Sequence, residues 1–407
     1  MDYPSDSLID DQRELVAAAR SFAARVLRPA GIELDRMPAA EVAARDSLLF
    51  RTVREAGMLG YTRMGGTPEI GGMGLSPLDR YLVLEQLGWG STGITAVVFL
   101  ASTPAEVALL SGDPGVIAEI ALPYYACEDG SLIGCWAITE PDHGSDTLGS
   151  LRPELDVRAR GQVIARRSGD DWILSGQKSA WVSNGPIATH AMLNVQLDAN
   201  GNMSDSGVCL LALDLPGVGR GKPLEKHGIR SLPQGELFFD DVRVPARNMV
   251  IGREGYAGYM HSHLSAFNAG VGCVATGLAR AAYECARDYC GARTQGGRPI
   301  FEHQSVRARL FRMHSLVQAS FSLSRDAWVT NLTRIERGET PRLELSITSK
   351  VFCTQAALEV ATLAVQLHGG NGMTKEYPVE MFLRDATALT VADGENAFLT
   401  QIAASLL

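Results

Sequence analysis

The sequence predicts an α+β multidomain protein: an N-terminal α-helical domain, a middle β-sandwich or barrel, and a helical C-terminal domain. Helical periodicity covers residues 9–130, short runs rich in β-branched and aromatic residues follow up to about residue 245, and helical periodicity then returns. Strands do not alternate with helices along the chain, which argues against a doubly wound nucleotide-binding fold. The predicted domains are residues 1–131, 132–247 and 248–407.

The first domain shows apolar residues at helical spacing. In the segment DQRELVAAARSFAARVLRPA they recur as Leu15, Val16, Ala19, Phe22 and Val26. The glycine-rich stretch GGTPEIGGMGLSP interrupts the pattern, as expected for a connection between helices.

The middle domain reads as strands. LIGCWAI, DWILS, HAMLNVQL, GVCLLALDL and GELFFDDVRV are short and bounded by Gly, Asn, Asp and Pro. After VPARNMVIGREG, long helices are predicted at roughly 256–292, 303–337 and 343–368. The first carries one apolar stripe, which consists of Phe267, Val271, Val274, Leu278 and Cys285.

Composition restricts the class of protein. Of 407 residues, 46% are hydrophobic and 20% charged, with a net charge of −9. An acidic chain is a poor partner for nucleic acid, which attracts basic surfaces. No apolar run approaches the roughly 18 residues that span a bilayer, and the N-terminus MDYPSDSLIDDQREL lacks the layout of a signal peptide. Seven cysteines without C-x-x-C pairs favour a reduced cytoplasmic protein with no cysteine metal site.

Six short blocks stand out in order along the chain. They are CWAITEPDHGSD (135–146), WILSGQKSAWVSNG (172–185), LFFDDVRVP (237–245), RTQGGRPIFEHQ (293–304), QLHGGNG (366–372) and RDA (384–386). Each alone is a weak signal. Together, in this order and over most of the chain, they resemble the signatures of the acyl-CoA dehydrogenase family.

This resemblance implies a fold, a cofactor and a reaction. Family members hold FAD between the β domain and a C-terminal four-helix bundle. A carboxylate removes the α-proton of an acyl-CoA or carrier-bound thioester, and the β-hydride passes to flavin N5. The resemblance also implies a homo-oligomer, commonly a dimer of dimers, and electron-transferring flavoprotein as the electron acceptor.

The resemblance places flavin contacts in the first two blocks. Trp181 is expected against the isoalloxazine ring, and the hydroxyl of Ser183 toward N5. Thr139 corresponds to a contact with the flavin pyrimidine, and Ser145 to one with phosphate or the substrate edge. Backbone amides of the turn at 144–145 are further candidate donors.

The later blocks are expected to bind the pyrophosphate and adenine of FAD. The residues are Arg293, Gln304, Gln366, Gly369 and Gly370. Arginine suits phosphate because its donors are fixed and always charged, and glycine allows close backbone approach. In the family the first two residues reach across a subunit interface. Gly296 stands where the family has Phe, so an aromatic wall is missing or supplied by another residue.

The predicted catalytic base is Asp393, nine residues after Arg384, where many family members have Glu. Glu395 lies two residues on and is the alternative carboxylate. The family's other base position corresponds to Phe267, which cannot take a proton. The next position is often Arg and here is Asn268, so the compensating positive charge is expected to be absent. Phe267, Asn268, Gly394 and Ser145 are the predicted substrate contacts.

Three functions remain open. The first is dehydrogenation of an unusual acyl thioester, with a branched, cyclic or carrier-bound acyl group, because Asp draws its oxygens back by about 1.5 Å relative to Glu. The second is a nitroalkane-oxidase-like flavoprotein, since that enzyme also uses Asp as base. The third is an FAD-binding member of the fold that is not a dehydrogenase. No metal site is predicted, because His261 and His263 point to different faces of a helix, and His143 is as readily a turn residue.

Overall fold

The computed structural model describes residues 8–407 except 152–159, 198–200 and 202–203. Within these ranges helices, strands and helices follow one another as predicted, and the fold class is confirmed. Helices of the first group end at Ala126, the strands of the large sheet run from Gly134 to Ile251, and helix α10 begins at Arg253. The first seven residues, on which part of the signal-peptide argument rests, lie outside the described ranges.

The N-terminal domain is built from short helices with defined starts. For example, Ser76 accepts a hydrogen bond from the backbone N–H of Asp79, and Pro77 occupies the first helical position. The helices are α1 (Asp10–Phe22), α2 (Arg28–Asp35), α3 (Ala39–Val42), α4 (Leu48–Met58), α5 (Pro77–Gly90), α6 (Thr92–Ala101), α7 (Thr103–Ser111), α8 (Pro114–Val116) and α9 (Leu122–Ala126).

One expectation about this domain is wrong. The segment Thr92–Ser111, which forms α6 and α7, is long and apolar enough by length and composition to cross a membrane. Its apolar window is 67% buried inside the protein. Burial on that scale is typical of a core helix, and these residues pack in the largest hydrophobic cluster.

The middle domain is one eight-stranded sheet in the order β6-β7-β3-β2-β4-β5-β8, with β1 paired to β4. Most pairs are antiparallel, but β1 and β2 both run parallel to β4, so the sheet is mixed. The strands are β1 (Gly134–Ala137), β2 (Ile164–Ser168), β3 (Asp171–Ser183), β4 (His190–Gln196), β5 (Ser206–Ala212), β6 (Val218–Arg220), β7 (Gln234–Pro245) and β8 (Met249–Ile251).

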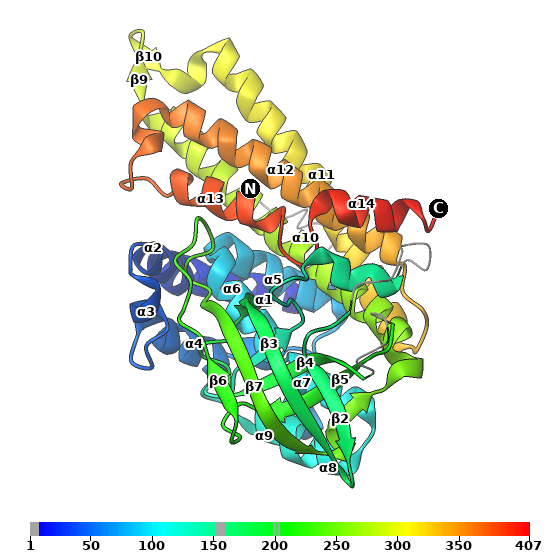
Figure 1. Cartoon of the computed structure of the whole chain (residues 1–407). Helices are drawn as coiled ribbons and strands as arrows, with labels where there is room; N and C mark the ends of the chain where they lie inside the picture. Colours follow the sequence, from blue (N-terminus) through cyan, green and yellow to red (C-terminus); the bar gives the residue numbers. More distant parts are fainter. Residues whose placement is uncertain (1–7, 152–159, 198–200, 202–203) are drawn as a thin grey trace.

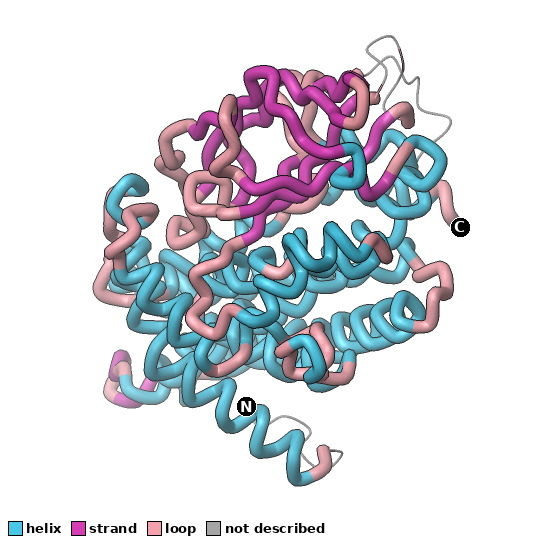
Figure 2. The backbone as a smooth tube through the Cα atoms, turned by 90° about the horizontal axis from the view of Figure 1, so that it is seen from below, coloured by secondary structure: helices cyan, strands magenta, loops and turns pink. Residues whose placement is uncertain are grey.

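The C-terminal domain is a bundle of long helices. They are α10 (Arg253–Ala292), α11 (Gln304–Glu336), α12 (Leu343–His368), α13 (Val379–Leu389) and α14 (Asn396–Ala404), and the hairpin β9 (Thr294–Gln295) and β10 (Arg298–Pro299) joins the first two. The predicted apolar stripe of α10 is buried from Phe267 to Leu278, and Cys285 is half-buried. Figure 1 shows these helices above the sheet, and Figure 2 shows the strands as a curved layer on one side of the helices.

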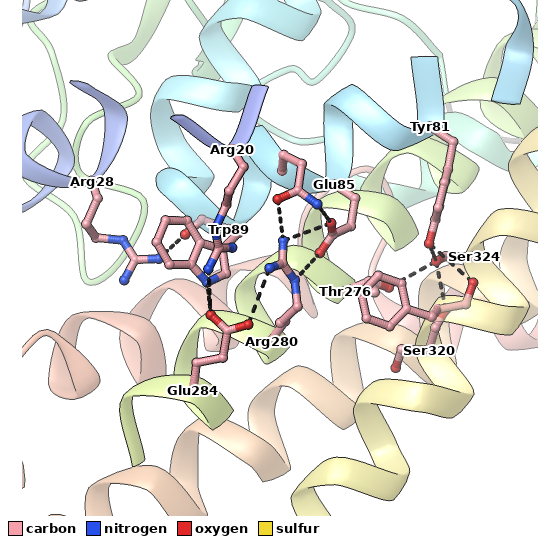
Figure 3. Close-up of polar contacts among 12 residues, drawn as sticks. Arg20, Arg28, Tyr81, Glu85, Trp89, Thr276, Arg280, Glu284, Ser320 and Ser324 are labelled. Carbon is pink, nitrogen blue, oxygen red and sulfur yellow. Dashed lines mark hydrogen bonds and ion pairs between the residues drawn. The ribbon is translucent and has the colours of Figure 1, made fainter. Parts of the chain in front are cut away.

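The first and last domains are joined by buried polar contacts between α5 and α10 (Figure 3). Arg280 donates from Nε and Nη2 to the two carboxylate oxygens of Glu85 at 2.8 and 2.9 Å. Arg20 of α1 binds Glu284 at 2.7 Å and lies 3.4 Å from the centre of the Trp89 ring. Such paired buried charges are costly to break, because loss of one partner leaves the other uncompensated. The N-terminal helices are therefore fixed against the bundle.

Candidate active site

A cavity of about 540 Å³ lies where the three domains meet. The N-terminal domain contributes Leu100 and the bundle contributes Leu264 and Asp393. The β domain contributes Trp181 and Ser183. The volume of this cavity is typical of a small-molecule site. The cavity thus brings together most of the predicted flavin contacts and the predicted base.

Asp393 sits in the short loop between α13 and α14. Its φ is +51°, a left-handed conformation that is uncommon for a residue other than glycine, and Gly394 follows with φ +97°. The Asp393 carbonyl oxygen accepts a hydrogen bond of 3.2 Å from Nδ2 of Asn268 on α10. The Asp-Gly pair therefore forms a turn, and the bundle holds that turn at the cavity wall.

A buried lysine lies behind this loop. Lys350 of α12 is fully buried, and its Nζ donates to the carbonyl oxygens of Thr390 and Gly394 at 3.3 and 2.7 Å and to Oδ1 of Asn396 at 2.7 Å. Burial lowers the pKa of Lys350 to about 8. The expectation that no positive charge compensates the base is therefore wrong, because Lys350 supplies it from a different helix.

Burial raises the pKa of Asp393 above its ordinary value, and the Lys350 charge opposes that rise. A carboxylate of raised pKa that faces a cavity is suited to accept a proton. Glu395 has the opposite environment. Its side chain is exposed and accepts hydrogen bonds from the N–H groups of Ala397 and Phe398, which cap α14 and lower its pKa. Of the two candidate carboxylates, only Asp393 lines the cavity.

Trp181 is displayed by an irregularity in β3. The register between β3 and β7 shifts between Lys178 and Val182, which leaves extra residues on β3. Such a bulge re-aims a side chain. Trp181 is 60% exposed and lines the cavity. Ser183, two residues on, lines the same cavity, and its Oγ accepts a 3.0 Å hydrogen bond from Nε2 of Gln234.

Thr139 and Ser145 also line the cavity. The hydroxyl of Thr139 accepts from Ser179 Oγ at 3.0 Å, and Ser145 Oγ accepts the N–H of Glu395 at 3.0 Å. Ser145 thus ties the β domain to the Asp393 loop. The N–H of Gly144, which we expected to face a ligand, donates instead to the Asp146 carboxylate at 2.7 Å.

Two predicted substrate contacts lie behind the cavity wall. Phe267 is 5% exposed and packs on Trp136, with ring centres 5.0 Å apart. Asn268 is fully buried, and it orients the Asp393 backbone. Neither lines the cavity, whereas Leu264, one turn earlier on α10, does.

The predicted pyrophosphate and adenine contacts form a separate group at the far end of the bundle (Figure 1). Arg293 follows α10, Gln304 begins α11 and Gln366 lies in the last turn of α12. All three are exposed, as are Gly369 and Gly370. None lines the cavity, so one chain does not bring the two groups of predicted cofactor contacts together.

The backbone conformation at position 296 explains why glycine stands there. It and Gly297 form the two-residue turn of the β9–β10 hairpin, with φ of +63° and +80°. A turn with positive φ at both positions strongly favours glycine and disfavours phenylalanine. The aromatic residue of the family pattern would therefore be strained in this tight turn.

Several side chains at this site were not predicted from the sequence. Lys350 is the only lysine or arginine of α12, and that single basic residue in a largely apolar helix was the available signal. Trp136 lines the cavity and donates from Nε1 to Oδ1 of Asn194 at 2.8 Å. Lys226 and Gln234 also line it.

The histidines do not form a metal site in the part of the chain that the structure describes. Burial lowers the pKa of His263 to about 3, and within the described ranges no cluster of His, Cys, Asp and Glu is placed to hold a metal.

Three family models match consecutive parts of the chain. They are described as acyl-CoA dehydrogenase N-terminal domain (residues 9–113), middle domain (135–242) and C-terminal domain (254–407). Together they cover most of its length.

Individual relatives agree with these matches. Cyclohex-1-ene-1-carbonyl-CoA dehydrogenase of Syntrophus aciditrophicus is 29% identical over 96% of this chain and 88% of its own. Isobutyryl-CoA dehydrogenase of Dictyostelium discoideum is 29% identical over 98% and 89%. The structure of butyryl-CoA dehydrogenase from Megasphaera elsdenii matches with a TM-score of 0.85 at 26% identity, over 100% of this chain and 99% of that one.

Proposed function

The chain belongs to the acyl-CoA dehydrogenase family of oxidoreductases that act on CH–CH bonds, and on that premise we propose that it is an FAD-dependent dehydrogenase of a branched or cyclic acyl thioester. The observation that carries the proposal is that one cavity presents Trp181, Ser183 and Asp393 together. These provide an aromatic platform, a hydroxyl donor and a base.

The residues fit an FAD cofactor. Trp181 is exposed and lines the cavity, so its indole offers a flat face for an aromatic ring system. Ser183 Oγ accepts from Gln234, so its own proton is left to donate, as a ring nitrogen requires. When bound, FAD supplies the acceptor for the hydride that leaves the β-carbon.

Asp393 acts on the α-carbon of the thioester. Its carboxylate takes the α-proton as the C–H electron pair becomes the new double bond, and the β-carbon loses hydride. The substrate loses two hydrogens in total and becomes the α,β-unsaturated thioester. Burial keeps the carboxylate basic, while Lys350 and Asn268 fix the backbone that carries it.

The acyl preference follows from the cavity walls and the short base. Leu100, Trp136, Leu264 and Val391 provide apolar walls. A base drawn back by about 1.5 Å requires the α-carbon to sit closer to the loop than a Glu base would. The two named relatives act, by their names, on a cyclic and a branched acyl group, which supports the same class here.

The experiment is an anaerobic reduction assay on purified protein. We expect it to retain FAD, and branched or cyclic acyl-CoA thioesters to bleach the flavin faster than straight-chain ones of equal carbon number. Bleaching by a nitroalkane instead would replace this function with an oxidase of that class. If the protein binds FAD but neither thioesters nor nitroalkanes bleach it, the remaining function is that of an FAD-binding family member that is not a dehydrogenase. Adding electron-transferring flavoprotein or O₂ as the only acceptor tests the proposed electron acceptor.

We also propose a homo-oligomer in a reducing compartment such as the cytoplasm. The exposed position of Arg293 and Gln304, outside the cavity, supports a partner subunit that completes the cofactor site. All seven cysteines are free thiols, which supports a reducing environment. Light scattering on the FAD-loaded protein measures the oligomeric state.

A further inference from the structure

Beside Ser183 the cavity wall contains two further polar side chains, Gln234 and Lys226, to which the proposed reaction assigns no contact with the reacting atoms. Ser183 of β3 and Gln234 of β7 are direct partners across the sheet. Gln234 is 7% exposed, and its Nε2 lies 3.0 Å from Ser183 Oγ and 3.4 Å from the Trp181 carbonyl oxygen. Lys226, in the loop before β7, places Nζ 2.8 Å from Gln234 Oε1.

The lysine determines which way the glutamine amide points. Nζ of Lys226 is surrounded by three oxygens, since it also donates to the carbonyls of Ile229 and Leu232 at 3.0 and 2.6 Å. Three acceptors match the three donors of an ammonium group. The amide must therefore turn its oxygen toward Lys226, and its NH₂ group is left to face Ser183.

The glutamine in turn determines the direction of the Ser183 hydroxyl. A serine hydroxyl has one proton, and its oxygen can accept. Because Gln234 donates to that oxygen, the Ser183 proton points elsewhere, and Ser183 faces the cavity. A serine without this neighbour could turn its proton back into the protein.

The loop that carries Lys226 is fixed to the bundle. The N–H of Ile229 donates to Asp385 Oδ1 at 2.6 Å, and Arg384 donates to the carbonyl oxygen of His227 at 3.0 Å. Arg384 is itself held by the carboxylate of Asp35. The ammonium is thereby held in place independently of any ligand.

We propose that Lys226 and Gln234 are positioning residues that hold the Ser183 hydroxyl as a hydrogen-bond donor toward the group bound against Trp181. The inference rests on the proposed function, in which that group is the flavin. A fixed donor stabilises the negative charge that the ring gains on reduction. The hydrogen-bonded series Lys226–Gln234–Ser183, called the relay below, therefore makes the bound cofactor easier to reduce. Its effect reaches the reaction only through Ser183.

The test is Gln234→Glu, which keeps the shape and pairs with Lys226 but cannot donate to Ser183. The serine proton then turns toward the carboxylate, and the donor into the cavity is lost. The expected result is a flavin that is still bound but whose reduction equilibrium falls by about tenfold. For a two-electron couple this is a shift of about 30 mV to more negative potential. We also expect a changed visible flavin spectrum and a lower kcat, with KM largely unchanged.

A double-mutant cycle with Ser183→Ala separates the relay from simple disruption. If the relay acts through Ser183, Gln234→Glu produces no further shift in potential in the Ser183→Ala background. An equal shift in both backgrounds would overturn the inference. The control Gln355→Glu makes the same charge change at an exposed position of α12, and its potential should match that of the unmodified protein.

Measurement at about pH 6 keeps Lys226 protonated, because burial lowers its pKa to about 7. The nearby charges that influence it are Asp385, which raises its pKa, and Arg230, which lowers it. Protein that binds no FAD would contradict the proposed function itself. Protein that binds FAD and is reduced by thioesters, but whose potential Gln234→Glu does not move, would contradict the relay alone.

Discussion

The cavity and the β9–β10 end of the bundle contain two halves of one predicted cofactor site, yet they differ in almost every physical respect. At the cavity, side chains from all three domains converge, and each is held by hydrogen bonds or packing within one chain. At the hairpin end, Arg293, Gln304 and Gln366 are exposed. One chain therefore forms the cavity half by itself, whereas the exposed residues at the hairpin end are the ones that we proposed a partner subunit completes.

The largest expected effect is at the cavity. Asp393→Asn keeps the size of the side chain but removes the base, so thioester-dependent flavin reduction should fall by about a thousandfold. Stopped-flow absorbance measures the rate, and FAD content should not change. Glu395→Gln is the matched control, because its amide oxygen can still cap α14, and its rate should stay within about threefold. Full activity in the Asp393 variant would remove the base assignment.

The next effect concerns the hairpin end. Arg293→Met should weaken FAD binding by about ten- to a hundredfold, the amount expected for a hydrogen bond from a charged donor. Turnover at saturating FAD should be close to that of the unmodified protein, because the cavity is intact. Fluorescence titration of the FAD-free protein measures the affinity. Arg312→Met, an exposed arginine of α11 paired with Glu359, is the control. Equal loss in both variants would show that the hairpin end has no special part in binding.

A smaller effect is expected from removing the charge of Lys350, which influences the pKa of Asp393. The base must be ionised, so the rate should rise with pH through the pKa of Asp393. The Lys350 cation lowers that pKa. Lys350→Met should therefore move the low-pH limb of the pH–rate profile to higher pH, by about one unit. The pH dependence of single-turnover flavin reduction measures the shift. Asn396→Ala removes one acceptor of Lys350 but keeps its charge, and should reduce stability without moving the limb.

The smallest expected effect separates the two acids of the loop. Glu395→Ala removes the cap of α14 and should lower the free energy of unfolding by about 1 kcal/mol. The cap lowers the pKa of Glu395, so its contribution is present above the unfolded-state pKa and is lost as pH falls through the folded-state value. Thermal unfolding at two pH values tests this. A large loss of thioester reduction in this variant would return Glu395 to the list of catalytic candidates.

The sequence predicted what depends on local pattern. The order of helical and strand segments was confirmed, since hydrophobic period and turn residues are local signals. Asp-Gly is a common turn pair, and both Asp393 and Gly394 have positive φ in the loop before α14. The family blocks brought Thr139, Ser145, Trp181 and Ser183 to notice, and all four line the cavity.

What the sequence missed depends on contacts between distant segments. Lys350 is 43 residues before Asp393 in the chain and is the only lysine or arginine in a largely apolar helix. Only the packing of α12 against the final loop brings its charge close to Asp393, the proposed base. Phe267 and Asn268 were expected in contact with substrate because of their position along α10, but the rotation of that helix places Leu264 on the cavity instead.

The sequence by itself determined the order of the three domains, the family and the identity of the short carboxylate at the proposed base position. These are properties of neighbouring residues, and they survive in a linear pattern. The tertiary structure decided which of two nearby acids faces the cavity, which lysine balances it and why glycine replaces an aromatic residue at 296. Those outcomes depend on backbone handedness, burial and side-chain direction, which become defined when segments far apart in the chain pack together.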